Sequence, residues 1–280
     1  MKFAVSNIAW TYAERLTAYA LLQDHGFTAL EIAPGLLFAE EADAFAPSQQ
    51  GLRARVAEFE RFGLHLVSMQ ALLFGANGAK LFGTAAEVER LVQGLNRAIE
   101  LAGALGIGNL VFGSPKQRNI PEGMERDEAI SQMRELILPL ADLSVARNTV
   151  LALEPNAVEY GTNFMTSFTE TLAVVRAIDH PGVTLNLDVG ALYMTDDFGN
   201  IAAHIADAGT LVSHVHISNT HLAPAPTSIA DARVVLGSLA ANGYRKAVSI
   251  EMKAVNGDHL TTLTAAVGRL REAAQAGHHM

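Results

Sequence analysis

The stretch AEVERLVQGLNRAIELAGALGIGNLVFG, residues 86–113, contains the pattern that decides the fold. Its first part places apolar residues three and four positions apart, which is typical of one face of an amphipathic helix. Gly106 ends this pattern, as glycine often does at the C-cap of a helix. The apolar run over 109–113 follows at once and indicates a buried strand. The stretch therefore predicts a helix that leads directly into a strand.

The same unit recurs along the whole chain of 280 residues. Strand-like runs return every 25–45 residues or so, eight times, with helical patterns between them. Eight strand–helix units in a chain of this length predict an α/β fold, a (β/α)8 TIM barrel in a single domain over residues 1–280. A doubly wound sheet would instead place a glycine-rich phosphate loop after the first strand, and SNIAWTYAE at 6–14 has no glycine. The predicted strands cover residues 2–8, 28–32, 64–70, 109–113, 149–155, 183–189, 211–218 and 247–252.

Composition excludes several classes of protein. The formal net charge is -9 and no basic block occurs, so we expect no nucleic-acid partner, since such binding needs clustered Lys and Arg. The chain has no cysteine, which removes disulfides, thiolate catalysis and Cys-ligated zinc. It contains no signal peptide and no apolar run of about 18 residues, so we expect no membrane association and a cytoplasmic location.

Four acidic or imidazole side chains lie at the ends of the last four predicted strands: Glu154 in LALEPN, Asp188 in LNLDVG, His216 in HVHISN and Glu251 in VSIEM. In a TIM barrel such strand ends meet at one mouth. Three carboxylates would repel one another there unless they were paired or bound to a cation. Oxygen ligands with one imidazole suit one divalent metal ion, Mn2+, Mg2+, Co2+ or Zn2+. The alternative is that some of them join polar networks with Lys or Arg.

These residues carry a resemblance to a known family. The chain resembles the sugar isomerase/epimerase branch of the xylose isomerase-like TIM-barrel superfamily, and is similar to ketose 3-epimerases and hydroxypyruvate isomerases. The similarity is strongest over residues 151–156, 159–192, 213–224 and 243–252. It implies that Glu154, Asp188, His216 and Glu251 bind one divalent metal.

The resemblance also implies a reaction. The metal would hold the carbonyl and hydroxyl oxygens of a carbohydrate substrate and stabilise an enediolate. Glu154 and Glu251 would be the catalytic acid/base pair, one removing a proton from the carbon beside the carbonyl and the other returning one. Relatives of this branch are often dimers or tetramers, so a homo-oligomer is plausible.

The chain also departs from the pattern of its relatives. Ala191 stands where they usually carry a histidine that contacts substrate oxygens, and His221 is the nearest match to their arginine. The stretch PAPTSIAD at 224–231 replaces a PGxGxID motif. The polar clamp on the substrate is therefore altered, so that either the substrate differs from the common free ketoses or activity is reduced or lost.

Further residues at predicted strand ends are candidates for substrate binding, each with a structural alternative. The aromatic ring after the first strand can pack on a sugar face or lie in the core or a lid. On the loop GSPKQRNIPEG, residues 113–123, Lys116 and Arg118 can grip an anionic group, but a solvated loop is slightly favoured. For Glu31 a substrate contact and a structural hydrogen bond are equally plausible, and His214 is expected in the core. The substrate-binding candidates are Trp10, Gln70, Glu159, His221 and Lys116.

Three other functions compete with isomerisation. Apurinic-site endonucleases share the superfamily but need further metal ligands, and Gln70, Gly113, Ser114 and Ala191 stand at the matching positions here. That reading is rejected. A metal-dependent dehydratase or lyase on a cyclic polyol or keto-sugar stays open, since it would use the same enediolate chemistry. A non-catalytic sugar-binding or metal-binding relative also stays open, with Ala191 as its best support.

Overall fold

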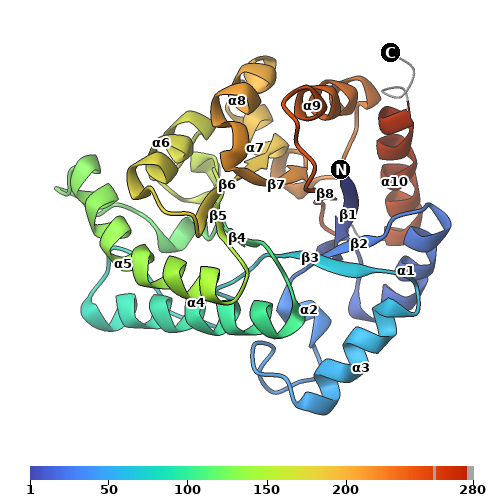
Figure 1. Cartoon of the computed structure of the whole chain (residues 1–280), viewed down its shortest axis with the longest axis horizontal. Coiled ribbons are helices and arrows are strands. Elements are labelled where there is room, and N and C mark those ends of the chain that lie inside the picture. Colours follow the sequence, from blue (N-terminus) through green and yellow to red (C-terminus); the bar gives the residue numbers. More distant parts are fainter. Residues whose placement is uncertain (255–256, 276–280) are drawn as a thin grey trace.

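A computed structural model gives the structure of residues 1–254 and 257–275. Eight parallel strands follow one another in sequence order and close into a barrel, because the first strand pairs with both the second and the last (Figure 1). This confirms the predicted (β/α)8 barrel. The strands are β1 (Lys2–Ser6), β2 (Ala29–Ile32), β3 (His65–Met69), β4 (Leu110–Phe112), β5 (Leu151–Leu153), β6 (Val183–Asp188), β7 (Val212–Ile217) and β8 (Ala247–Ile250).

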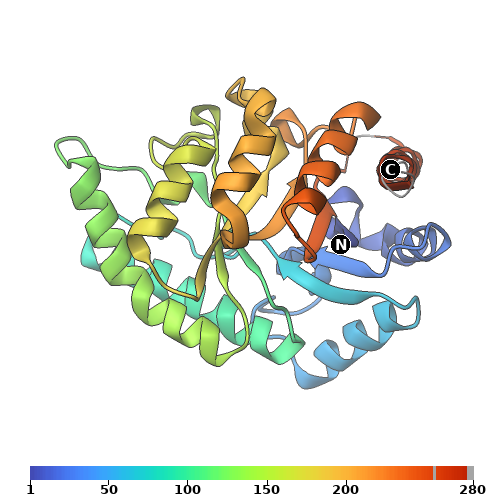
Figure 2. The same cartoon turned by 45° about the horizontal axis from the view of Figure 1, so that its top comes forward.

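The helices form a ring outside the strands (Figure 2). Helix α10 packs against both α1 and α9, so the last unit completes the ring beside the first. Within the described ranges, no helix combines the length and the apolar character that a membrane crossing requires. The helices are α1 (Arg15–Asp24), α2 (Pro34–Leu37), α3 (Gln49–Glu60), α4 (Ala85–Leu105), α5 (Arg126–Ala146), α6 (Phe168–Ile178), α7 (Val189–Met194), α8 (Ile201–Ala208), α9 (Ile229–Ala241) and α10 (His259–Gln275).

Helix α4 shows how the sequence forms one unit of the ring. At its start the side chains of Thr84 and Glu87 form a capping box, which satisfies backbone N–H groups that have no partner within the helix. Its buried residues, among them Leu91 and Leu95, turn one apolar face toward the strands. Gly106 then adopts the left-handed conformation with φ 67°, which glycine reaches without strain, and the chain turns into β4.

Short 3-10 turns follow several strands and build the mouth of the barrel, where the site described below lies. They are η1 (Asn7–Ala9), η2 (Tyr12–Glu14), η3 (Pro115–Gln117), η4 (Val158–Tyr160) and η7 (Thr220–Leu222). Two further 3-10 turns flank α8: η5 (Phe198–Asn200) precedes it, and η6 (Gly209–Leu211) leads from it into β7.

Candidate metal centre

The strand ends bring the four predicted ligands together at the carboxyl end of the barrel. Glu154 directly follows β5, Asp188 is the last residue of β6, His216 lies in β7, and Glu251 directly follows β8. The pairing of β6 with β7 sets Asp188 beside His216. The backbone N–H of Glu154 donates to Phe112 O at 3.2 Å, and that of Glu251 donates to Ile217 O at 3.0 Å. Each ligand is thus fixed by the strand next to its own.

The ligand atoms of this quartet lie within 4.8 Å of one another, and all four residues are buried. His216 Nδ1 is 3.0 Å from Glu154 Oε1, 3.2 Å from Glu251 Oε2 and 3.7 Å from Asp188 Oδ2. Ligands about 2.1 Å from one shared ion lie roughly 3.0–3.4 Å apart in octahedral or tetrahedral geometry. The spacing and the donor set of the quartet therefore fit a single divalent cation.

The second nitrogen of His216 faces away from the quartet. Its Nε2 lies 3.0 Å from Glu31 Oε2, so a neutral ring that binds a cation through Nδ1 would carry its proton on Nε2. Burial alone would lower the pKa of His216, but the carboxylates of Glu251 and Glu31 outweigh it and hold the pKa well above its ordinary value. A carboxylate behind a histidine ligand is a common arrangement around protein metals, since it fixes the ring orientation.

Glu31 itself lies inside the barrel among hydrogen-bond donors. His214 Nε2 is 2.9 Å from Glu31 Oε2, and Gln70 Nε2 donates to Glu31 Oε1 at 2.8 Å. Burial opposes ionisation of Glu31, but the imidazoles of His216 and His214 prevail and lower the pKa of the carboxyl well below its usual value. Glu31, His214 and His216 also form a cluster that satisfies metal-ligand spacing. Because hydrogen bonds account for its contacts, we assign this cluster a supporting role.

Neutral donors orient two of the carboxylates in the quartet. Asn186 Nδ2 donates to Glu154 Oε1 at 2.8 Å, and Asn156 Nδ2 donates to Glu154 Oε2 at 3.1 Å. Asp188 is the N-cap of α7 and accepts from the backbone N–H of Ala191 at 2.5 Å and from Ser218 Oγ at 2.6 Å. These bonds hold the oxygens at the spacing described above.

Glu251 is buried beside His216 and the other two carboxylates of the quartet. Burial raises the pKa of Glu251 to about 7, and His216 opposes that rise. A buried carboxyl with this pKa close to two other carboxylates marks a functional site more often than a structural one.

A pocket of about 250 Å³ opens over the quartet at the mouth. Glu154, Asp188 and Glu251 lie in its floor and wall. Most of its other polar lining is neutral, and no Lys or Arg belongs to the described residues that line it. The lining residues are Gln70, Ala71, Val111, Gly113, Ser114, Pro115, Glu154, Asn156, Tyr160, Asp188, Asn219, Leu222 and Glu251.

Of the five predicted substrate-binding residues, the structure brings only Gln70 to the pocket lining. Trp10 is 3% exposed and packs edge-on against Tyr19 in the core, because the chain turns inward through η1 after the first strand. Glu159 and Lys116 are exposed, on η4 and η3 respectively, and neither lines the pocket.

His221 is exposed and lies beside the pocket rather than in its lining. Its ring packs edge-on against Tyr160 at 6.0 Å between centroids, and Tyr160 does line the pocket. Burial raises the pKa of Tyr160 to about 12, so its hydroxyl is a neutral donor at physiological pH. Ala191 is 5% exposed and is also outside the pocket lining.

Arg118 corrects the prediction of a solvated loop. Its side chain is fully buried, because five backbone and side-chain oxygens from the loops after β4 and β5 surround the guanidinium. Lys116, two residues earlier, is exposed as predicted for such a loop.

Sequence reasoning missed several residues that support the site. Asn186 lies two positions before Asp188, hence on the same side of the strand, and that spacing was a usable signal. No local sequence pattern marks Gly113 as part of the site. A Cβ atom built at Gly113 would overlap Glu154 Oε2, so the close approach of the carboxylate requires glycine there.

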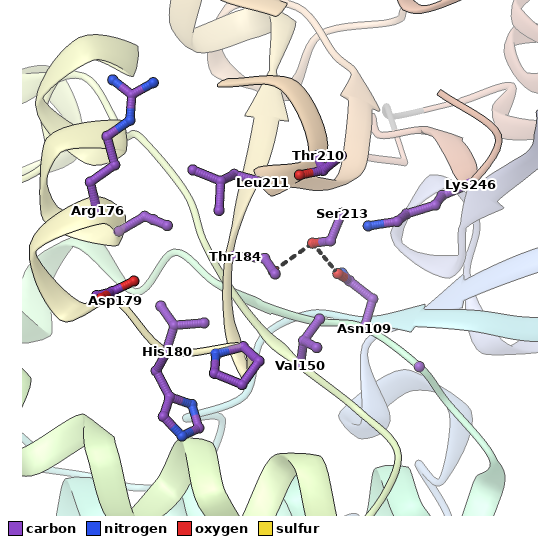
Figure 3. A pocket seen from close by; sticks show the side chains of 14 residues that line it. Asn109, Val150, Arg176, Asp179, His180, Thr184, Thr210, Leu211, Ser213 and Lys246 are labelled. Carbon is purple, nitrogen blue, oxygen red and sulfur yellow. Dashed lines mark hydrogen bonds between the residues drawn. The ribbon is translucent and has the colours of Figure 1, made fainter. Parts of the chain in front are cut away.

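A larger cavity, of about 600 Å³, lies at the opposite end of the barrel (Figure 3). It is lined by residues that precede β4 to β8, such as Asn109 and Lys246. Ser213 Oγ donates to Asn109 Oδ1 at 2.7 Å and lies 2.7 Å from Thr184 Oγ1, so these polar groups satisfy one another. Since catalysis in this fold takes place at the carboxyl ends of the strands, we place the candidate site in the smaller mouth pocket.

Solved structures share this fold at low sequence identity. The 3-keto-D-glucoside 4-epimerase YcjR from E. coli matches with a TM-score of 0.76 and 19% identity, over 97% of this chain and 99% of that chain. D-allulose 3-epimerase from Methylomonas sp., in complex with D-allulose, matches with a TM-score of 0.75 and 20% identity, over 99% of this chain and 96% of that chain. A family 2 AP endonuclease from Brucella melitensis matches with a TM-score of 0.72 and 18% identity, over 97% of this chain and 99% of that chain. At these identities the likeness shows the fold alone.

A search of curated protein sequences found no match. The family model described as xylose isomerase-like TIM barrel matches residues 19–275, nearly the whole chain. The chain therefore belongs to the xylose isomerase-like TIM-barrel family.

Proposed function

We propose that the protein is a divalent-metal-dependent sugar isomerase or epimerase. The observation that carries the proposal is the buried quartet of three carboxylates and one imidazole beneath the mouth pocket, with ligand atoms within 4.8 Å of one another. Glu154, Asp188, His216 and Glu251 would hold the ion. Their donor set accommodates Mn2+, Mg2+, Co2+ or Zn2+.

When bound, a divalent cation supplies Lewis-acid polarisation of a substrate carbonyl, which makes the neighbouring C–H acidic and stabilises an enediolate. Glu154 and Glu251 both line the pocket, one after β5 and the other after β8. We assign them the proton transfer at the carbon beside the carbonyl, one carboxylate removing a proton and the other returning one.

The pocket supports a carbohydrate as substrate. Gln70, Ser114, Asn156, Tyr160 and Asn219 present neutral amide and hydroxyl groups to it, and such groups match sugar hydroxyls. A volume of about 250 Å³ equals roughly eight water molecules in the liquid, which suits one small sugar. Two of the similar structures are sugar epimerases by name, a 3-keto-D-glucoside 4-epimerase and a D-allulose 3-epimerase.

The test combines metal analysis with deuterium uptake. The purified protein is loaded with Mn2+ and incubated in D2O with a panel of ketoses, and mass spectrometry and NMR follow exchange at the carbon beside the carbonyl. Exchange with sugar isomerisation supports the proposal. Loss of water from the substrate identifies a dehydratase or lyase instead, and metal binding with no turnover identifies a non-catalytic binder.

One substitution tests the function of the site while the fold is monitored separately. Glu251→Gln should weaken Mn2+ binding and abolish exchange while circular dichroism stays unchanged, because the amide carries no charge for the cation or the proton. Glu135→Gln on α5, an exposed carboxylate far from the mouth, is the matched control. Normal turnover by Glu251→Gln would contradict the assignment.

A further inference from the structure

Arg118 is the largest fully buried side chain of the described residues, and no carboxylate among them lies within ion-pair distance of it. Desolvation lowers the pKa of its guanidinium to about 9, so its burial costs free energy that the surroundings must offset. Four backbone carbonyls do so. Nη1 donates to Gly113 O at 2.7 Å and Glu154 O at 2.9 Å, Nε donates to Phe164 O at 3.1 Å, and Nη2 donates to Met165 O at 3.3 Å.

The remaining bond leads to the quartet. Nη2 of Arg118 also donates to Asn156 Oδ1 at 3.0 Å. A guanidinium has donors only, so the atom of Asn156 that faces it must be the amide oxygen. The amide nitrogen is thereby turned to the other side, where it donates to Glu154 Oε2 at 3.1 Å. Arg118 thus determines which way the amide points, and the amide in turn holds one oxygen of the carboxylate.

We propose that Arg118 is a positioning residue that acts through Asn156 to orient the carboxylate of Glu154. The inference rests on the proposed function, in which Glu154 is both a metal ligand and a proton-transfer group. Arg118 touches neither the pocket nor the other ligands. Its bond to the carbonyl of Glu154 holds the backbone, and its route to the carboxylate is the Asn156 amide.

A purely structural role for Arg118 is the competing explanation, because the same guanidinium joins the loop after β4 to residues 164–165. The structure offers a matched control for that role. Asn163 joins the same two loops, accepting from Ile120 N at 2.7 Å and donating to Ile120 O at 2.9 Å, and it is exposed and makes no bond to Glu154. Asn163→Ala therefore loosens the loops and leaves the amide of Asn156 in place.

The experiment measures the Mn2+ affinity of the metal-free protein by electron paramagnetic resonance, which needs no substrate. Arg118→Met, Asn156→Ala and the double variant form a cycle. We expect each single variant to weaken Mn2+ binding about tenfold, as is usual when a group that orients a metal ligand is removed. The double variant should also lose about tenfold rather than about a hundredfold, because both changes break one chain of bonds. Asn163→Ala should stay within twofold.

A conservative variant separates charge from geometry. Arg118→Lys keeps the positive charge, but an ammonium cannot span Asn156 and the four carbonyls, so it should lose affinity as Arg118→Met does. It also replaces Arg118→Met in the cycle if circular dichroism shows that the latter does not fold. Wild-type affinity in Arg118→Lys or in Asn156→Ala, or losses that multiply in the double variant, would overturn the proposal.

A second readout keeps this inference separate from the proposed function. The side-chain amide signals of Asn156, assigned by their absence in Asn156→Ala, should shift in the 15N–1H spectrum of Arg118→Lys and not in that of Asn163→Ala. If the wild-type protein binds no Mn2+, or turns over no ketose, the proposed function fails, and this spectrum still decides whether Arg118 orients the amide. Unchanged Asn156 signals in Arg118→Lys would refute that role.

Discussion

At the scale of single residues, the candidate metal site depends on Gly113, which has no side chain and so leaves room for the carboxylate of Glu154. Gly113→Ala places a methyl group where Glu154 Oε2 lies, so the carboxylate must move out of the quartet. We expect Mn2+ affinity to fall about tenfold with the barrel still folded. Equilibrium titration and circular dichroism measure the two. Gly237→Ala, where a Cβ meets no heavy atom within 4 Å, is the control. Unchanged affinity in Gly113→Ala would show that the carboxylate has another place to go.

Glu31 allows a second residue-scale prediction. Glu31→Gln keeps the shape of the side chain but removes the charge that lies 3.0 Å from His216 Nε2. The imidazole then faces a neutral amide in place of a carboxylate, so its tautomer and orientation are held less firmly. We expect Mn2+ binding 10- to 100-fold weaker than in the wild type. His65→Gln, at an exposed histidine on β3, controls for the loss of an unrelated ionisable group. If Glu31→Gln bound Mn2+ normally, the tautomer would be set by something else.

The residues of the quartet could be predicted from the sequence, whereas several of the residues that support them could not. A polar residue at the end of an apolar run can be recognised wherever it occurs, and the closed barrel brings four such ends together. Asn156 meets Arg118, and Ser218 meets Asp188, only when segments 38 and 30 positions apart come together, so no local pattern marks these contacts. Arg118 was wrongly predicted on a solvated loop, because the carbonyls that surround it come from residues up to 47 positions away.

At the scale of elements, the start of α4 gives a prediction about how the stability of the folded state changes at low pH. The hydrogen bond from Lys80, together with the N–H and hydroxyl of Thr84, lowers the pKa of Glu87 from 4.5 to about 2. The ionised carboxylate therefore stabilises the folded state fully above about pH 4.5, and this contribution is lost as the pH falls toward 2. Glu87→Gln should destabilise the protein at pH 6 and differ less from the wild type at pH 3.

Urea unfolding at the two pH values measures this difference. Glu89→Gln, two residues after Glu87 on the same helix and outside the capping box, provides the control for loss of a surface charge. An equal gap between Glu87→Gln and the wild type at both pH values would mean that the capping box works through its shape and not through its charge.

All eight predicted strands are present, but several of them begin or end at other residues than predicted. The run 149–155 yields only Leu151–Leu153, because Thr149 N–H bonds to Ser144 O at the end of α5 and Pro155 has no N–H to give. Helix α7 was not predicted, because the apolar residues after Asp188 continue the pattern of the strand. The helix begins there because the Asp188 side chain caps it.

At the scale of the whole molecule, the quartet links the cation to stability. Three buried carboxylates that repel one another favour any state that separates them, and a bound cation reverses this. Free Mn2+ at 100 times its Kd should stabilise the folded state by about 2.7 kcal/mol and raise Tm by roughly 5 °C. Differential scanning calorimetry with Mn2+ and with EDTA measures the change. The Glu251→Gln variant should show little of it. Equal Tm values for the wild type under both conditions would argue that the quartet holds no ion.

The (β/α)8 barrel could be predicted by counting strand–helix units in the sequence, and such a count needs no knowledge of side-chain contacts. The choice between the two ends of the barrel follows from the strand direction. Cavity size does not settle it, since the larger cavity, about 600 Å³, lies at the end without the quartet. The pocket over the quartet is shaped by loops after β3, β4, β5 and β7, and loop conformations are what the sequence pattern specifies least.

The contact between Glu31 and His216 joins residues 185 positions apart in the chain. The last ligand, Glu251, lies later still. During synthesis an emerging chain therefore has no place for the ion until almost all of it has left the ribosome and the first and eighth strands have met. A cation held by the proposed ligands would therefore bind after the early units have assembled and could not serve as their template. A truncated or half-closed product would lack the complete ligand set.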